Sequence, residues 1–111
     1  MSKKSMDYQE YLIDSLKEPE EARGYLNAAL EGGEVDVFLR ALQNVVKAQR
    51  GLRKLAEETN KSRTSLYKAL SEEGNPHLKS ISDILSVMGL HLAIVANQRI
   101  KHIKGRYAKR T

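Results

Sequence analysis

The sequence has no cysteine and no long apolar run, and these absences exclude several classes of protein. Without cysteine the chain cannot form a disulfide framework or a thiolate metal site. No apolar run approaches the roughly 18 residues of a transmembrane helix. The opening MSKKSMDYQE also lacks the apolar core of a signal peptide. We therefore expect a protein that spans no membrane and resides in the cytoplasm.

The signatures of catalysis and of cofactor binding are missing as well. His77, His91 and His102 lack the spacing of metal ligands, and no HExxH motif accompanies them. No serine or carboxylate lies in a nucleophile motif, and there is no glycine-rich phosphate loop. We expect isolated histidines at the surface or partly buried, no metal, no cofactor and no enzymatic activity.

Charge is present in both signs but unevenly distributed along the 111 residues, a length that suits one domain. Residues 1–50 carry 7 Lys and Arg against 9 Asp and Glu, whereas residues 51–111 carry 12 against 5. This asymmetry favours an anionic partner for the second half, most commonly nucleic acid. A solvated basic surface without a partner is the alternative.

Apolar residues mostly recur at spacings of three and four, which predicts an all-α fold. We expect helices over 7–16, from Pro19 to the Gly32-Gly33 stop, from residue 34 to Gly51, and over about 52–59, 63–71 and 79–88. The apolar positions expected to face inward in the first three helices are Tyr8, Tyr11, Leu12, Leu16, Ala22, Tyr25, Leu26, Ala29, Leu30, Val35, Phe38, Leu39, Leu42, Val45 and Val46. The three tyrosines among them could instead form a groove for a partner protein.

After Gly89 the period of the apolar residues changes from helical to alternating. Leu90, Leu92 and Ile94 alternate with the intervening residues, so a short strand is possible. A lone strand has unpaired edges and would need a partner such as a second copy of the chain; the alternative is a last turn of core packing. The remaining NQRIKHIKGRYAKRT has six Lys and Arg and no acid. We expect a loosely ordered basic tail that either lies along phosphates or is only a solubilising end.

The stretch LAEETNKSRTSLYKAL joins two short helical patterns through a few polar residues. Asn60 tolerates the left-handed backbone conformation that a sharp turn requires. Ser62 has the hydroxyl of a helix N-cap. The residues expected to hold the second helix on the core are Leu66, Ala69 and Leu70, and those left on its free face are Arg63, Thr64, Tyr67 and Lys68.

Such a pair fits a helix-turn-helix, with Ala56 as the small residue at the helix crossing. The second helix of this motif offers its N-terminal polar residues to base edges in the major groove. Arginine can bond guanine bidentately, and threonine and serine can bond bases or phosphates. An ordinary helical hairpin with a solvated face is the alternative. The joint, the Ser62-Arg63-Thr64 sequence, the following GNP and the basic second half together favour the DNA-binding interpretation.

The blocks SRTSLYKAL…GNP and EEARGYLNAAL together resemble the addiction-module antidote proteins, also called prophage DNA-binding proteins. These are HigA-like antitoxins with a helix-turn-helix of the phage-repressor and Cro (XRE) type, and the resemblance covers about residues 7–95. It implies a lambda-repressor-like domain of about five helices with an extra N-terminal helix pair. The implied division is an extension over 1–33, a helix-turn-helix domain over 34–95 and a tail over 96–111.

The resemblance also implies a function, namely sequence-specific repression of the protein's own operon. A homodimer would bind double-stranded operator DNA and neutralise a neighbouring toxin of the RelE/HigB type, an mRNA-cleaving ribonuclease. The base contacts would come from Ser62, Arg63, Thr64 and Lys68, while Tyr67, Ser71 and Asn75 would approach sugar or phosphate. Two other interpretations stay open: a prophage-type regulator without a toxin, and a toxin-binding module with weak DNA binding.

Two positions depart from the pattern of repressors of this type. Many of them have Gln or Thr at the start of the first motif helix, in contact with phosphate, where this chain has Gly51 and Leu52. Arg53 could replace that contact. The turn usually carries glycine and then an apolar residue, but here it carries Asn60 and Lys61. We expect Lys61 to extend outward and add a phosphate contact.

Overall fold

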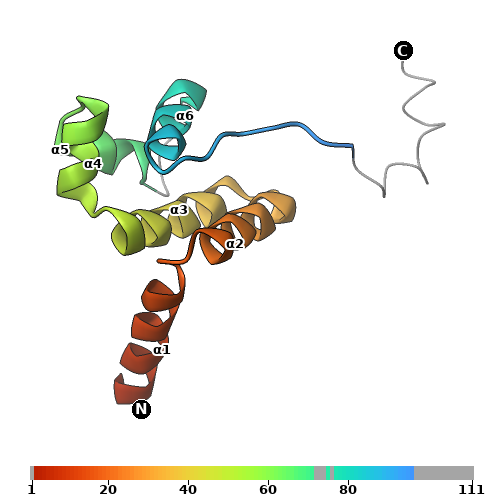
Figure 1. Ribbon diagram of the computed structural model, residues 1–111, viewed down its shortest axis with the longest axis vertical. Coiled ribbons are helices and arrows are strands. Elements are labelled where there is room, and N and C mark those ends of the chain that lie inside the picture. Colours follow the sequence, from red (N-terminus) through yellow and green to blue (C-terminus); the bar gives the residue numbers. More distant parts are fainter. Residues whose placement is uncertain (1, 72–74, 76, 97–111) are drawn as a thin grey trace.

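The structure, a computed structural model, describes residues 2–71, 75 and 77–96, with side chains from Tyr8 onward (Figure 1). It contains six helices and no strand within these residues, so the predicted all-α fold is confirmed. The helices are α1 (Ser2–Ser15), α2 (Pro19–Gly32), α3 (Val35–Gln49), α4 (Leu52–Thr59), α5 (Arg63–Ala69) and α6 (Leu78–Val87).

The ends of these helices follow from the residues that the sequence places there. α2 begins at Pro19, whose fixed backbone suits the first helical position. It ends before Gly33, which adopts the left-handed conformation at φ 79° and donates its N–H to the Leu30 carbonyl. Gly51, at φ 80°, likewise separates α3 from α4. The predicted stop at Gly32-Gly33 and the predicted bounds of α4 are therefore confirmed.

α3 is the central helix, and both halves of the chain pack against it (Figure 1). It buries six apolar side chains, which are Phe38, Leu39, Ala41, Leu42, Val45 and Val46. The residues that join them from the first two helices are Leu16, Ala22, Leu26 and Ala29, and those from the second half are Leu55, Leu66, Leu70, Ile81, Ile84 and Leu85. One continuous apolar core therefore holds the described helices together.

α1 extends away from the other helices (Figure 1), and its tyrosines are not in the core. Tyr8 is 67% exposed and Tyr11 is 72% exposed, so the prediction that they face inward is wrong. The C-terminal end of α1 is anchored by partly buried Leu12 and, directly after the helix, by buried Leu16, whose carbonyl accepts a 3.0 Å hydrogen bond from Gln49 Nε2. Tyr25, in contrast, is half-buried, and its hydroxyl accepts a 2.9 Å hydrogen bond from Asn44 Nδ2.

Two further apolar residues that were expected inside lie at the surface, on either side of the turn at Gly33. Leu30 is 43% exposed and Val35 is 56% exposed. They occupy the last turn of α2 and the first turn of α3, beyond the part of each helix that its neighbour covers. Their helical spacing fits the apolar stripe, but here the stripe lines an open cleft beside the start of α6 and Leu92 instead of a filled interior.

The predicted strand over residues 90–95 is not formed, although the segment is extended (Figure 1). A strand requires a second strand to hydrogen-bond with it, and among the described residues no backbone hydrogen bond joins residues 91–96 to another segment. Leu90 alone is held, because its N–H donates to the Leu85 carbonyl at the end of α6. The predicted basic tail lies outside the described residues, apart from Ala96 at its start.

Candidate nucleic-acid interface

The joint between α4 and α5 is a tight turn fixed by two polar residues. Asn60 adopts the left-handed conformation at φ 61°, and its N–H donates to the Ala56 carbonyl. Ser62 Oγ accepts a 3.0 Å hydrogen bond from the Ser65 N–H, which caps the start of α5. Leu55 and Leu66 are fully buried and hold the two helices on the core. The predicted left-handed conformation of Asn60 and the predicted Ser62 cap are confirmed, and together these contacts fix where α5 begins and how it projects.

The first residues of α5 are presented to solvent. Ser62, Arg63 and Thr64 are exposed, as are Tyr67 and Lys68 further along the helix. Within the described residues, neither Arg63 nor Lys68 has an ion-pair partner. Their charges are therefore available to an anionic ligand without the loss of an intramolecular contact.

A polar groove of about 760 Å³ lies between α5 and the start of α6. Five predicted site residues line it, namely Lys61, Ser62, Lys68, Ser71 and Asn75. Ser65, His77 and Ser80 line it too and were not predicted. Ser65 was recognisable from its helical spacing to Ser62 and Lys68, whereas the position of Ser80 depends on how α6 packs.

Lys61 does not extend outward, and this prediction is wrong. Its side chain is only 26% exposed, and Nζ lies 3.5 Å from Asp83 Oδ2 on α6. Lys79 Nζ lies 3.3 Å from the same carboxylate oxygen. Lys61 takes this position because the half-buried Asp83 carboxylate attracts it. The ion pair between Lys61 and Asp83 links the turn to α6, and it neutralises the Lys61 charge that was expected to contact phosphate.

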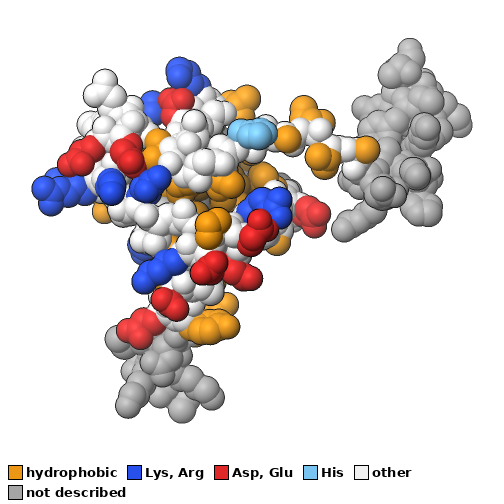
Figure 2. Space-filling model, in the orientation of Figure 1, with side chains coloured by type: hydrophobic (Ala, Val, Ile, Leu, Met, Phe, Trp, Pro, Cys, Tyr) orange, Lys and Arg blue, Asp and Glu red, His pale blue; other side chains and the backbone are white. Residues whose placement is uncertain are grey.

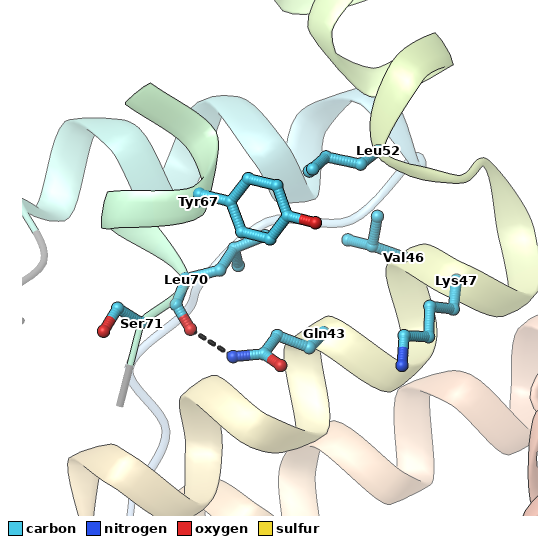
Figure 3. A pocket seen from close by; sticks show the side chains of 7 residues that line it. All are labelled: Gln43, Val46, Lys47, Leu52, Tyr67, Leu70 and Ser71. Atoms are coloured by element: carbon cyan, nitrogen blue, oxygen red, sulfur yellow. Dashed lines mark hydrogen bonds between the residues drawn. The ribbon is translucent and has the colours of Figure 1, made fainter. Parts of the chain in front are cut away.

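Tyr67 does not line this groove but a second hollow (Figure 3). Its ring leans over a hollow of about 420 Å³ between α3, the start of α4 and α5, near Val46 and Leu52. Gln43 Nε2 spans the floor of this hollow and donates to the Leu70 carbonyl. Tyr67 is still 68% exposed, so its outer edge remains accessible beside the groove.

Arg53 is exposed near the start of α4 and does not line the groove. Its Nε lies 4.0 Å from Glu57 Oε2, and both side chains are largely solvated. Such a pair contributes little to stability, so a phosphate could replace the glutamate at small cost.

Arg50 braces the motif and was not predicted. Its Nη2 donates to the Val87 carbonyl at 2.8 Å, and its Nε lies 3.1 Å from Glu58 Oε1. This contact between Nε and the Glu58 carboxylate is an ion pair and not a hydrogen bond, and the buried Nε–H has no hydrogen-bond acceptor among the described residues. One guanidinium thus joins the ends of α3, α4 and α6.

The two halves of the molecule differ in surface charge. Figure 2 shows acidic side chains gathered over the part of the molecule formed by α1 and α2. The exposed acidic residues of this part, up to the first turn of α3, are Glu10, Asp14, Glu18, Glu20, Glu21, Glu31, Glu34 and Asp36. The unpaired cations of α5 lie in the other half, so an anionic ligand is favoured there and a cationic one near α1 and α2.

The described part of the chain offers no constellation for metal binding. His77 and His91 are both exposed, and His102 lies outside the described residues. Among the residues described, no three His, Asp or Glu side chains are grouped so as to hold a metal ion. In the same residues, every helix is too short or too polar to cross a bilayer.

These features define a class: a small all-helical protein with a braced helix pair that presents polar and basic side chains. The chain matches the family model described as "Probable addiction module antidote protein" over residues 3–96. A Haemophilus influenzae protein described as "Uncharacterized protein" is 31% identical over 83 residues, covering 75% of this chain and 84% of that protein. No solved structure matches the chain. The chain belongs to the family of probable addiction module antidote proteins, as its resemblance predicted.

Proposed function

We propose that the protein is an autorepressing antitoxin that binds double-stranded operator DNA as a homodimer, with α4 and α5 as a helix-turn-helix. The observation that carries this proposal is the start of α5. Its direction is fixed by the Ser62 cap, and Arg63 and Thr64 are exposed there. A recognition helix must place its N-terminal side chains in a major groove in this way.

The individual roles follow from where each side chain lies. Ser62, Arg63, Thr64 and Lys68 reach base edges or the adjacent phosphates, and Arg63 is suited to bidentate recognition of guanine. Ser71 and Asn75, at the end of the groove, approach the backbone of the DNA. Arg53 contacts phosphate from α4, and Tyr67 packs against sugar or phosphate beside the groove. Lys61 contributes only if it leaves Asp83.

The partner protein is a toxin similar to the RelE/HigB type, an mRNA-cleaving ribonuclease. Proteins that bind RNA carry basic surfaces, and the acidic surface over α1 and α2 is complementary to one. Tyr11 lies exposed on the part of α1 that extends from the core, where an amphipathic side chain suits an interface. The protein therefore acts by binding rather than by catalysis, in the cytoplasm, where its operator and its toxin are found.

Binding to a fluorescent duplex of the native promoter tests the DNA-binding part of this proposal. A scrambled duplex of equal length is the control, and each is measured at two salt concentrations. We expect a preference for the promoter of on the order of 10³-fold or more. Equal and strongly salt-dependent binding to both duplexes would leave only phosphate contact by a basic surface, and toxin binding would become the main function.

A toxin-binding role is favoured independently by the separation of charge between the two halves. Co-expression with the product of the neighbouring reading frame, followed by purification through the toxin, tests it. A complex that restores growth supports the antitoxin role. A neighbouring frame that is not toxic would instead indicate a prophage-type regulator without a toxin.

A further inference from the structure

The segment over residues 91–96 leaves the body of the protein as an extended chain (Figure 1), and its last two large apolar side chains are uncovered. Ile94 is 102% exposed and Val95 is 80% exposed. Within the described residues, no backbone hydrogen bond involves residues 91–96. A chain that exposes both its apolar side chains and its backbone groups in this way has the properties of an edge strand without a neighbour.

The segment is also directed by the fold rather than merely attached to it. Gly89 adopts the left-handed conformation at φ 77°, and the Leu90 N–H donates to the Leu85 carbonyl, which closes the end of α6. The chain therefore leaves α6 in a set direction. The following residues begin at a fixed point and present the same edge in every copy.

An apolar cleft of about 330 Å³ lies beside the start of this segment. Leu92 lines the cleft together with Leu30, Val35, Phe38, Leu78 and Ile81. Leu78 is 70% exposed and Val35 is 56% exposed, so none of the described residues covers the opening. The exposed strand edge and the exposed cleft are continuous through Leu92, and one occupant can satisfy both.

We propose that this occupant is a second copy of the chain, whose residues 91–96 pair antiparallel with the same residues of the first. The proposal deepens the proposed function, because it rests on the homodimer that operator binding requires. A pairing centred on Ala93 is symmetric about a two-fold axis, because each chain then makes the same contacts with the other, as an isologous dimer requires. It places Leu92 opposite the partner's Ile94, on the same face of the two-stranded ribbon. The partner's Ile94 then covers the cleft that Leu92 lines, and His91 lies opposite the partner's Val95.

Charge favours a second copy over an unrelated partner. Residues 90–96 contain no Lys, Arg, Asp or Glu, so pairing two identical segments brings no like charges together. Both segments alternate apolar residues at the same spacing, and the two-fold arrangement matches every Leu92 with an Ile94. Each chain thereby gains a hydrogen-bonded strand and buries an exposed apolar edge.

The test measures the mass of the full-length protein by light scattering or sedimentation across a range of concentrations. We expect a dimer for the wild type. Ile94→Glu should weaken self-association by on the order of 100-fold or more, because two buried apolar side chains are removed from each dimer. Tyr8→Glu is the matched control, since it places the same charge at an exposed apolar position on α1. It should leave the dimer intact, and circular dichroism should show the same helix content for both variants.

Cross-linking tests the register independently, because the chain has no cysteine of its own. In the proposed pairing two Ala93 residues face each other, with Cα atoms about 4.5–5.5 Å apart, a separation that a disulfide can span. Ala93→Cys should form a covalent dimer on mild oxidation, whereas Gln9→Cys, exposed on α1, should not. A wild type that is monomeric at every concentration, a dimer that survives Ile94→Glu, or equal cross-linking of the two cysteine variants would overturn the proposal. If the protein forms this dimer but binds its promoter no better than a scrambled duplex, the DNA-binding function alone is refuted.

Discussion

Replacing Arg63 and Thr64 by alanine should remove the discrimination between operator and other DNA while leaving the fold intact. Both side chains are exposed, and within the described residues Arg63 has no ion-pair partner, so their removal leaves no buried group unsatisfied. Alanine is also a better helix former than threonine, so the free energy of unfolding should change by no more than about 0.5 kcal/mol.

The effect on DNA binding depends on how many bases the variant can no longer recognise. A good side-chain contact to a base contributes about 1–3 kcal/mol of discrimination, so the removal of each one should reduce the preference by about 5- to 150-fold. Fluorescence anisotropy with promoter and scrambled duplexes measures this ratio directly. The double variant should bind the promoter almost as weakly as the scrambled duplex.

A second variant separates base recognition from phosphate contact. Arg53→Ala removes a cation on α4, outside the groove, that is only weakly paired with Glu57. It should weaken binding to both duplexes by a similar factor and reduce the salt slope by about 1. The reasoning is refuted if the Arg63 and Thr64 double variant keeps the wild-type ratio of affinities, or if it behaves as Arg53→Ala does.

Two further predictions concern the turn and the acidic half of the molecule. Ser62→Ala should lower the free energy of unfolding by about 1 kcal/mol, because it removes the hydrogen bond from the Ser65 N–H. Urea unfolding measures this change, with substitution of the exposed Ser82 in α6 by alanine as the control. An equal effect of both substitutions would contradict the capping role. Tyr11→Lys should weaken toxin binding by at least about 10-fold without changing promoter affinity, because it replaces an exposed aromatic side chain with a charge of the toxin's own sign. Calorimetry with purified toxin measures the affinity. An unchanged toxin affinity would mean that the toxin binds elsewhere.

Local chemistry in the sequence was sufficient to predict most of the helices and the joint between α4 and α5. The left-handed Asn60 and the Ser62 cap are contacts within a few residues, so residue type and spacing determine them. The interior apolar positions of α2 and α3 were predictable for the same reason. Helical periodicity identifies the stripe that packs inward wherever a neighbouring helix is present to cover it.

The errors arose where the outcome depends on distant parts of the chain. Periodicity places Tyr8 and Tyr11 on one side of α1 but does not say whether another helix covers that side. Lys61 turns inward because Asp83, far along the sequence, lies beside it in the fold. The alternation over residues 90–95 indicates a strand, yet a strand exists only where a second one pairs with it. Within a single chain no local pattern supplies that information.

The central position of α3 couples the two ends of the molecule energetically. Because α3 packs against α1, α2 and α4 within one continuous core, neither α2 nor the pair formed by α4 and α5 can unfold alone without exposing its buried face. A ligand bound at either end therefore stabilises the whole chain, by an amount that grows with the logarithm of its concentration relative to its dissociation constant. Toxin held at α1 and α2 would raise the population of folded α5 available to the operator, and operator DNA would protect the toxin-binding surface from proteolysis in return. Protection from proteolysis at one end of the chain should therefore increase with the occupancy of the site at the other end.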